Sequence, residues 1–347
     1  MNSNKKTFKK DNGLILPVDR ELYLFSALSP TSEGTNYWDP PPRAPISDRQ
    51  TGRILLQVHQ ILDLFRSTGI DLNGKKMLDI GTGNGMVPRL MLELSELSEA
   101  VGSDPFLDGE HQTSWQPHDH EEGITRIRDY IDRTCPDRID YCAYQQHAKL
   151  ENMVFKPQPI AIPKRRSKQY RFDQVGVHNL QNIDDYFDIF YCKAIEHIHD
   201  WETAFASVSA VANPDAIFYL KHRSFFSYLG AHRYSSTDIP WGHVLLTDRE
   251  FRRYAQEFHE TRAEEMCTFF FEGLAYPRYS VSDMVRIAHE KGFVVHGIQV
   301  EAPRYANAVA QYIYHIDSFW KTVWENYPRL GADELFSGMV HILFRKK

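Results

Sequence analysis

A short glycine-rich stretch constrains the fold of this chain more than any other part of it. Residues 75–86 read KKMLDIGTGNGM, in which an apolar run leads directly into Gly81, Gly83 and Gly85. Because glycine lacks a Cβ and adopts backbone conformations closed to other residues, such a turn lets a ligand approach the main chain. A segment with apolar residues at helical spacing follows at 87–97. The stretch therefore predicts a strand, a ligand-binding turn and a helix.

The spacing of these glycines helps to distinguish between the possible classes of ligand. A phosphate-binding GxxxxGK[ST] loop needs a Lys-Ser or Lys-Thr pair, and none follows here. A dinucleotide fingerprint would need a third glycine where Met86 stands. Asp79, two positions before the first glycine, would repel a pyrophosphate but attract an ammonium group. Asp104, at the end of the next predicted strand, can accept ribose hydroxyls. The pattern favours an amino acid joined to a nucleoside over a nicotinamide dinucleotide.

Helical and strand patterns alternate along most of the chain. We predict helices at 47–68, 87–97, 200–212 and 280–292, and strands at 76–80, 99–104, 168–172, 186–193, 215–222, 293–300 and 337–347. This alternation predicts an α/β fold with a doubly wound, mostly parallel sheet.

These motifs resemble those of the class I S-adenosylmethionine-dependent methyltransferases. The resemblance covers roughly residues 50–221 and 280–347, and rests mainly on MLDIGTGNG, VGSDPF and FDIFYCKAIEHI. It implies a Rossmann-like, seven-stranded sheet with a reversed last strand, and S-adenosylmethionine as the cofactor. The resemblance also implies which residues bind that cofactor: Asp79, Gly81, Thr82, Gly83 and Gly85 for the methionine part, Asp104 for the ribose, Asp173 for the adenine, Cys192, Lys193 and Ala194 for the methionine side of the pocket, and Pro105 as a further cofactor-binding residue.

The remaining parts of the chain are predicted to be additions to that domain. Residues 1–46 end in a proline-rich stretch and are predicted to be an N-terminal arm, before a methyltransferase domain at 47–347. Insertions are predicted at about 108–165 and 222–279. Since both would emerge at the carboxyl ends of the strands, where ligands bind in such folds, we expect them to cover the active site and select the substrate.

Histidines in the second insertion are the candidate bases. Methyl transfer to an alcohol or phenol needs a group that takes a proton near neutral pH, for which histidine is suited. We predict His243 as the base, because Pro240, Trp241 and Gly242 give it a rigid setting, although each histidine here has an ordinary loop role as the alternative. The other catalytic candidates are His222 and Glu196, and the substrate-binding candidates are Arg223, His232, Arg233 and Trp241.

The Glu196–His197 pair raises the question of a metal. In plant small-RNA 2′-O-methyltransferases, a similar Glu-His pair binds a metal with another glutamate three residues earlier. Lys193 occupies that earlier position here and would repel a divalent cation, so we predict no metal. The alternative role for Glu196 is to stabilise a helix N-terminus.

The composition of the chain argues against some kinds of binding partner. The net charge of −6 and pI of about 6.2 argue against nucleic acid, and no apolar run is long enough for a membrane span. With no signal peptide pattern, we expect a cytoplasmic protein. The sequence predicts methyl transfer to a small polar molecule, at oxygen, without indicating an oligomeric state. The alternatives are an N-methyltransferase that relies on positioning, and a cofactor-binding scaffold without catalysis.

Overall fold

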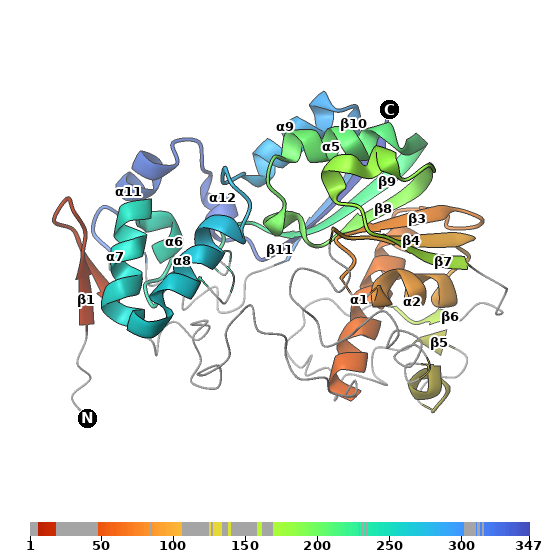
Figure 1. The fold of residues 1–347 in the computed structure, drawn as a ribbon, viewed down its shortest axis with the longest axis horizontal. Coiled ribbons are helices and arrows are strands. Elements are labelled where there is room, and N and C mark those ends of the chain that lie inside the picture. The colour runs from red at the N-terminus through yellow and green to blue at the C-terminus, as the bar shows by residue number, and fades with distance from the viewer. Residues whose placement is uncertain are drawn as a thin grey trace.

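A seven-stranded sheet organises the structure, a computed structural model (Figure 1). It describes residues 6–18, 48–83, 85–105, 125, 128–133, 138–139, 158–161, 169–228, 230, 232, 235–301, 310, 313 and 316–347. The strand order is β10-β11-β9-β8-β3-β4-β7. The strands are β3 (Lys76–Ile80), β4 (Glu99–Ser103), β7 (Gln169–Asp173), β8 (Phe187–Cys192), β9 (Ala212–Arg223), β10 (Phe293–Val300) and β11 (Met339–Lys346).

Strand direction agrees with the sequence-based prediction. Strands β7, β4, β3, β8 and β9 pair in parallel, whereas β11 runs antiparallel to both β9 and β10. The predicted α/β fold with a reversed last strand is thus confirmed. The carboxyl ends of the parallel strands meet at one edge of the sheet, where ligands bind in open α/β folds.

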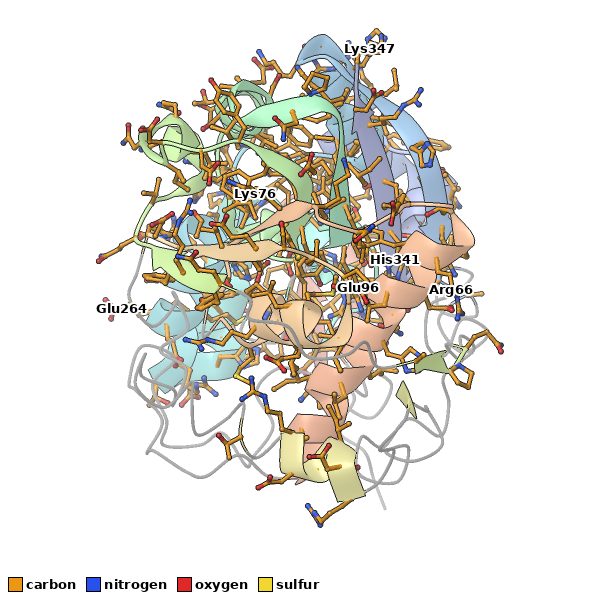
Figure 2. All side chains as sticks on the ribbon, turned by 90° about the vertical axis from the view of Figure 1, so that its right-hand side faces the viewer. Arg66, Lys76, Glu96, Glu264, His341 and Lys347 are labelled. Atoms are coloured by element: carbon orange, nitrogen blue, oxygen red, sulfur yellow. The ribbon has the colours of Figure 1, made fainter. Side chains whose placement is uncertain are left out.

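Helices cover both faces of the sheet (Figures 1 and 2). Successive strand residues point to opposite faces, so each face has its own core. One core joins Tyr191 and Tyr219 to the first two helices, and the other joins Phe190 and Phe218 to the later pair. The helices are α1 (Asp48–Ser67) and α2 (Met86–Leu94) on one face, and α5 (Trp201–Ala210) and α9 (Val281–Glu290) on the other, with the 3₁₀ turns η2 (Val177–Asn182) and η3 (Ile195–His197).

A second group of elements lies beside the sheet (Figure 1, left). Its buried apolar residues form a separate cluster, rich in aromatic rings, which we call the cap core. Within it, Phe251 stacks on Phe270 with ring centroids 3.8 Å apart. The cap core is built by β1 (Lys6–Lys9), β2 (Ile15–Val18), α6 (Gly242–Leu245), α7 (Asp248–His259), η4 (Glu260–Arg262), α8 (Ala263–Glu272), α11 (Phe319–Asn326) and α12 (Ala332–Leu335).

The β1–β2 hairpin is fixed to the cap through polar contacts. The Lys10 side chain is 5% exposed, donates a hydrogen bond to the carbonyl of Leu245 and lies 3.3 Å from a Glu250 carboxylate oxygen. The backbone N–H of Asp11 donates to the other Glu250 oxygen at 2.8 Å. Residues 6–18 of the predicted arm are therefore an ordered hairpin docked on α7.

The first predicted insertion lies mostly outside the described residues. Of its sequence, the structure gives the antiparallel pair β5 (Arg138–Ile139) and β6 (Ile160–Ala161). In the part of the chain that the structure describes, no helix has the length and apolar character needed to cross a membrane.

Candidate functional site

The glycine turn after β3 has the backbone conformation that its sequence predicts. Gly81, Gly83 and Gly85 have φ angles of +68°, +56° and +69°, in the left-handed region that side chains other than hydrogen disfavour. A Cβ added to Gly81 would lie 2.7 Å from the Cβ of Ala194. The turn therefore needs glycine for its conformation and for its close approach to the end of β8.

Asp79 is a buried carboxyl group beneath this turn. It is 3% exposed and accepts a hydrogen bond of 2.8 Å from the Thr82 hydroxyl. Burial raises the pKa of Asp79 to about 7; the Thr82 bond opposes the rise, Asp104 adds to it, and Lys193 opposes it. A desolvated carboxylate gains a counter-ion when an ammonium group binds next to it, so the residue fits the amino acid part of S-adenosylmethionine.

Asp104 lies beside the same turn, just after β4. One of its carboxylate oxygens accepts the backbone N–H of Gly83 at 3.0 Å. The end of β7 is adjacent, since the Asp104 N–H donates to the carbonyl of Asp173 at 3.4 Å. The Asp173 carboxylate itself pairs with Arg171 at 3.1 Å, and Pro105 is exposed. The structure thus brings together the acidic residues predicted for the ribose and adenine.

The end of β8 forms another wall of this region. Cys192 is a fully buried free thiol whose pKa is raised by burial. Lys193 donates to the Gln57 side-chain oxygen at 3.3 Å, and desolvation lowers the pKa of its amine although the side chain is exposed to solvent. A lysine side chain that is exposed to solvent but has a poorly hydrated amine is expected on a concave surface. Ala194, partly buried, contacts the glycine turn.

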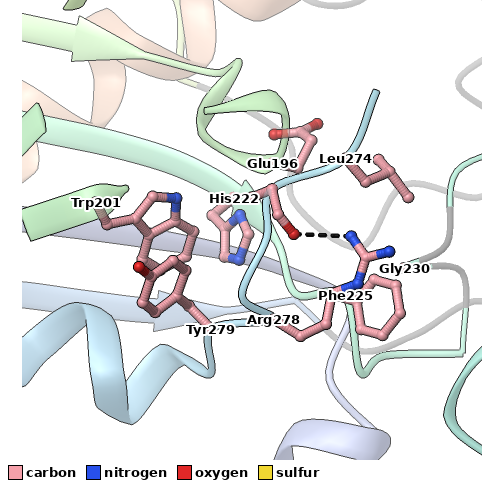
Figure 3. Close-up of a pocket in the computed structure, with 9 residues that line it drawn as sticks. Glu196, Trp201, His222, Phe225, Gly230, Leu274, Arg278 and Tyr279 are labelled. Atoms are coloured by element: carbon pink, nitrogen blue, oxygen red, sulfur yellow. Dashed lines mark hydrogen bonds between the residues drawn. The ribbon is translucent and has the colours of Figure 1, made fainter. Parts of the chain in front are cut away.

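A small cavity lies next to these strand ends (Figure 3). It has room for about one water molecule. The loop after β8, the end of β9 and the segment between α8 and α9 contribute its walls. The lining residues are Glu196, Trp201, His222, Phe225, Gly230, Leu274, Ala275, Arg278 and Tyr279.

Two polar side chains in this cavity have no hydrogen-bond partner. His222 is 2% exposed, and neither of its ring nitrogens is hydrogen-bonded. Burial and, to a smaller extent, the charge of Arg223 lower the pKa of His222 to about 3. Oxygen Oε2 of Glu196 is likewise buried without a partner. Since an unmade buried hydrogen bond is costly, this pair is suited to a ligand with a polar group.

Arg278 is a cavity residue that the sequence analysis did not identify. Its guanidinium donates to the carbonyl of Ala275 at 2.7 Å and lies 4.4 Å from the ring centre of Phe225 (Figure 3). Burial lowers the pKa of this group to about 10. Trp201 and Tyr279, also missed, stack with ring centroids 4.6 Å apart. No motif marks these residues; the only signal is the aromatic and basic stretch AYPRY before a predicted helix.

The predicted base, His243, lies in the cap core and is not among the cavity-lining residues. Its ring nitrogen Nε2 donates to the carbonyl of Ser227 at 3.0 Å, and its ring meets Phe225 at a right angle. Burial lowers the pKa of His243 to about 4. Trp241 is also buried there, and its indole N–H donates to the carbonyl of Leu335 at 3.2 Å. Both residues thus have contacts that stabilise the cap.

The other candidates are divided between the cap and the strand end. His232 packs between His197 and Phe269, with ring centroids 5.6 and 5.0 Å away. Arg223 ends β9, next to His222, and Arg233 lies outside the described residues. Among the described residues, no group of three or more His, Cys, Asp or Glu side chains could hold a metal ion.

Comparisons with known proteins identify the family of the chain. Residues 52–296 match the model of a methyltransferase domain family, and no curated protein matches the sequence. Similar solved structures include the cyclopropane synthase MmaA2 from Mycobacterium tuberculosis (15% identity, TM-score 0.42, 94% of this chain and 93% of that chain). Another is the magnesium protoporphyrin IX methyltransferase ChlM from Synechocystis PCC 6803 with bound SAH (11% identity, TM-score 0.41, 94% and 98%). The chain belongs to the class I methyltransferase family, and its cofactor is S-adenosylmethionine.

Proposed function

We propose that this enzyme methylates an oxygen atom of a small polar molecule, and that His222 receives the proton. The observation that supports this is the pair of unpartnered polar groups, His222 and Glu196, in one cavity at the carboxyl end of the sheet. His222 was one of three catalytic candidates in the sequence. The buried contacts of His243 with cap carbonyls favour His222 over it.

Methyl transfer to an alcohol does not require a strong base. Bound S-adenosylmethionine supplies an electrophilic methyl group. An alcohol oxygen that gains a methyl group becomes a very strong acid, so even a weak base can remove its proton. With a pKa of about 3, His222 is neutral at physiological pH and keeps one ring nitrogen free to accept a hydrogen bond. Glu196 is placed on the same cavity and can receive the proton afterwards.

Positioning is the larger contribution of the site. Methyl transfer gains most from holding the acceptor in line, in a volume from which water is excluded. Trp201, Phe225 and Tyr279 supply flat apolar walls, and Arg278 lies over the Phe225 ring with its guanidinium anchored to backbone. The net charge of −6 supports our expectation that the acceptor is a small polar molecule and that nucleic acid is not the substrate. A cytoplasmic location remains part of the proposal.

The first test separates cofactor binding from catalysis. Purified protein is titrated calorimetrically with S-adenosylmethionine, S-adenosylhomocysteine and NAD, and then assayed with methyl-labelled cofactor against small alcohols, phenols and amines. We expect His222→Asn to bind S-adenosylhomocysteine within about twofold of the parent and to lose roughly a hundredfold in methyl transfer. The exposed His289, substituted as His289→Asn, is the matched control and should leave both quantities unchanged.

Other results lead to the alternatives. Methylation of amines alone, insensitive to His222→Asn, would favour an N-methyltransferase that relies on positioning. Cofactor binding without transfer to any compound would favour a scaffold. Transfer that falls in His243→Asn and not in His222→Asn would return the base to His243.

A further inference from the structure

Three basic residues gather on the α1 side of the sheet, where β8 and β9 end. Cys192 of β8 is in register with Leu220 of β9, so the next residues, Lys193 and Lys221, lie side by side. Because residues two apart in a strand share a face, Arg223 continues the same row. His222, between them in sequence, points to the opposite face and into the cavity of Figure 3.

Helix α1 covers this row with a polar stripe. Arg53, Gln57 and Gln60 are spaced four and three residues apart, which places them on one side of the helix. Oxygen Oε1 of Gln57 accepts from Lys193 at 3.3 Å, and Oε1 of Gln60 accepts from Lys221 at 2.9 Å. The two lysines are therefore held by neutral amides.

The carboxylates near the two lysines, Glu196 and Glu301, act on them only at a distance. Among the described residues, no ion pair involves Arg53, Lys193 or Lys221. The nearby Glu301 already pairs with His341 at 2.8 Å. Lys221 is 9% exposed, and burial together with Lys193 and Arg223 lowers its pKa to about 8, against the opposite effect of Glu301.

This arrangement is costly in the free protein. Burying a lysine and placing like charges next to it both disfavour its charged form. An anion bound between the lysines would reverse both effects and would add charge-assisted hydrogen bonds. The amides of Gln57 and Gln60 keep the amines oriented without neutralising them, as a site that awaits an anion requires.

We infer that the methyl acceptor carries an anionic oxygen group, a carboxylate or phosphate, which binds at Lys193, Lys221 and Arg223 beneath α1. The inference rests on the proposed function, because it assigns this group to the molecule that is methylated. The anion site and the His222 cavity flank the same end of β9, and Glu196 both lines the cavity and acts electrostatically on Lys193. Because they lie on opposite faces of the sheet, an acceptor that contacts both must pass over the end of β9, where the strand finishes at Arg223.

The carboxylate of the cofactor has the same chemistry and is the other possible occupant. The test therefore uses protein saturated with S-adenosylhomocysteine, in which that carboxylate is already present. Calorimetry at constant ionic strength compares 4-hydroxybenzoate with 4-hydroxybenzamide, and phenyl phosphate with benzyl alcohol. Each pair differs mainly in the anionic group.

Lysine variants test whether the anions bind at this row of basic residues. We expect both anions to bind, their neutral partners to bind at least about tenfold more weakly, and Lys221→Met to remove this difference. S-adenosylhomocysteine affinity should stay within about twofold. Lys321→Met is the matched control, because Lys321 is an exposed residue of α11 that pairs with Glu325 at 3.8 Å. Arg223→Met, at the partly exposed end of β9, repeats the test if Lys221→Met does not fold.

Every outcome bears on the inference. It is overturned if the neutral compounds bind as tightly as the anions, if no anion binds at millimolar concentration, or if Lys221→Met weakens S-adenosylhomocysteine binding instead. Lysine-dependent anion binding without methylation of any hydroxylated anion would support the anion site and contradict O-methylation. Methylation of neutral alcohols that depends on His222 would support O-methylation and contradict the anion site.

Discussion

At the scale of single residues, the site holds two groups whose charged forms the folded protein disfavours. Asp79 is buried with a pKa of about 7, and His222 is buried with a pKa of about 3. Both residues were predicted from sequence, Asp79 from its position before the glycines and His222 from its segment. The burial of both side chains, and the absence of a hydrogen-bond partner at His222, could not be predicted because they depend on residues distant in the chain.

Asp79 should couple cofactor binding to stability. Its pKa in the folded state lies above the ordinary value of 3.8, so between about pH 4 and pH 7 the folded state binds more protons than the unfolded state. The free energy of unfolding of the free protein should therefore fall as pH rises through this window. We expect Asp79→Asn to be more stable than the parent at pH 8, and to lose S-adenosylhomocysteine binding.

Urea unfolding at pH 5 and pH 8 measures the first effect, and calorimetry the second. Asparagine keeps an oxygen that can accept from Thr82, so the substitution removes mainly the charge. Equal pH dependence in the two proteins would contradict the expectation.

His243 should matter for stability and not for cofactor binding. Its pKa of about 4 lies below the ordinary 6.5, so the stability it provides is present above pH 6.5 and is lost as pH falls towards 4. We expect His243→Ala to lower the free energy of unfolding at pH 7.5 by about 2–3 kcal/mol, because it leaves a cavity and unpaired carbonyls. Thermal unfolding measures this loss, and unchanged stability would place His243 outside the supporting role that its contacts indicate.

At the scale of elements, prediction succeeded where one local pattern decides the structure. The strand, glycine turn and helix around Gly81 follow directly from the sequence, because glycine adopts these φ angles at much lower cost than other residues. The helix expected to end at residue 97 ends at Leu94, where Ser95 becomes extended. Leu97 misled the prediction, since it is buried in the core without being helical. Arg278 was missed because its cavity is assembled from distant segments.

A comparison of Gly81→Ala with Gly69→Ala should distinguish the ligand-binding turn from an ordinary turn. Alanine there meets both a positive φ and the Cβ of Ala194 at 2.7 Å, whereas Gly69, at φ +71°, faces open space. We expect Gly69→Ala to cost about 1–2 kcal/mol of stability from backbone strain alone. Gly81→Ala should cost more and should weaken S-adenosylhomocysteine binding at least tenfold, as measured by calorimetry. Similar affinities in the two variants would show that the turn can relax without displacing the ligand.

At the scale of the whole molecule, the chain has cores on both sides of the sheet and a cap core beside it. Sequence periodicity predicted the strands and helices around the sheet, because each kind of element has its own apolar spacing. The cap core could not be predicted in this way, since it joins the first residues of the chain to segments more than 200 positions later. The contact between Lys10 and Leu245 spans 235 residues.

Lys10 should be essential to that long-range contact. Removing one partner of a buried ion pair leaves the other charge desolvated, so Lys10→Ala should lower the free energy of unfolding by about 3 kcal/mol. The neighbouring Lys9 is exposed, and Lys9→Ala is the matched control with an expected change below about 0.5 kcal/mol. Denaturant unfolding followed by tryptophan fluorescence reports on the cap through Trp241. A loss as small as that of Lys9→Ala would mean that the hairpin contributes little.

The way the cap core is assembled has a consequence for engineering new acceptor preferences. Family members could be recombined by grafting residues 222–279 alone onto another sheet, as if they were a self-contained module. That graft would leave behind the hairpin at 6–18 and the helices α11 and α12, whose side chains complete the same core. Its apolar surface would be exposed and prone to aggregation. A folded chimera must exchange these three stretches together, because they build one core from discontinuous parts of the chain.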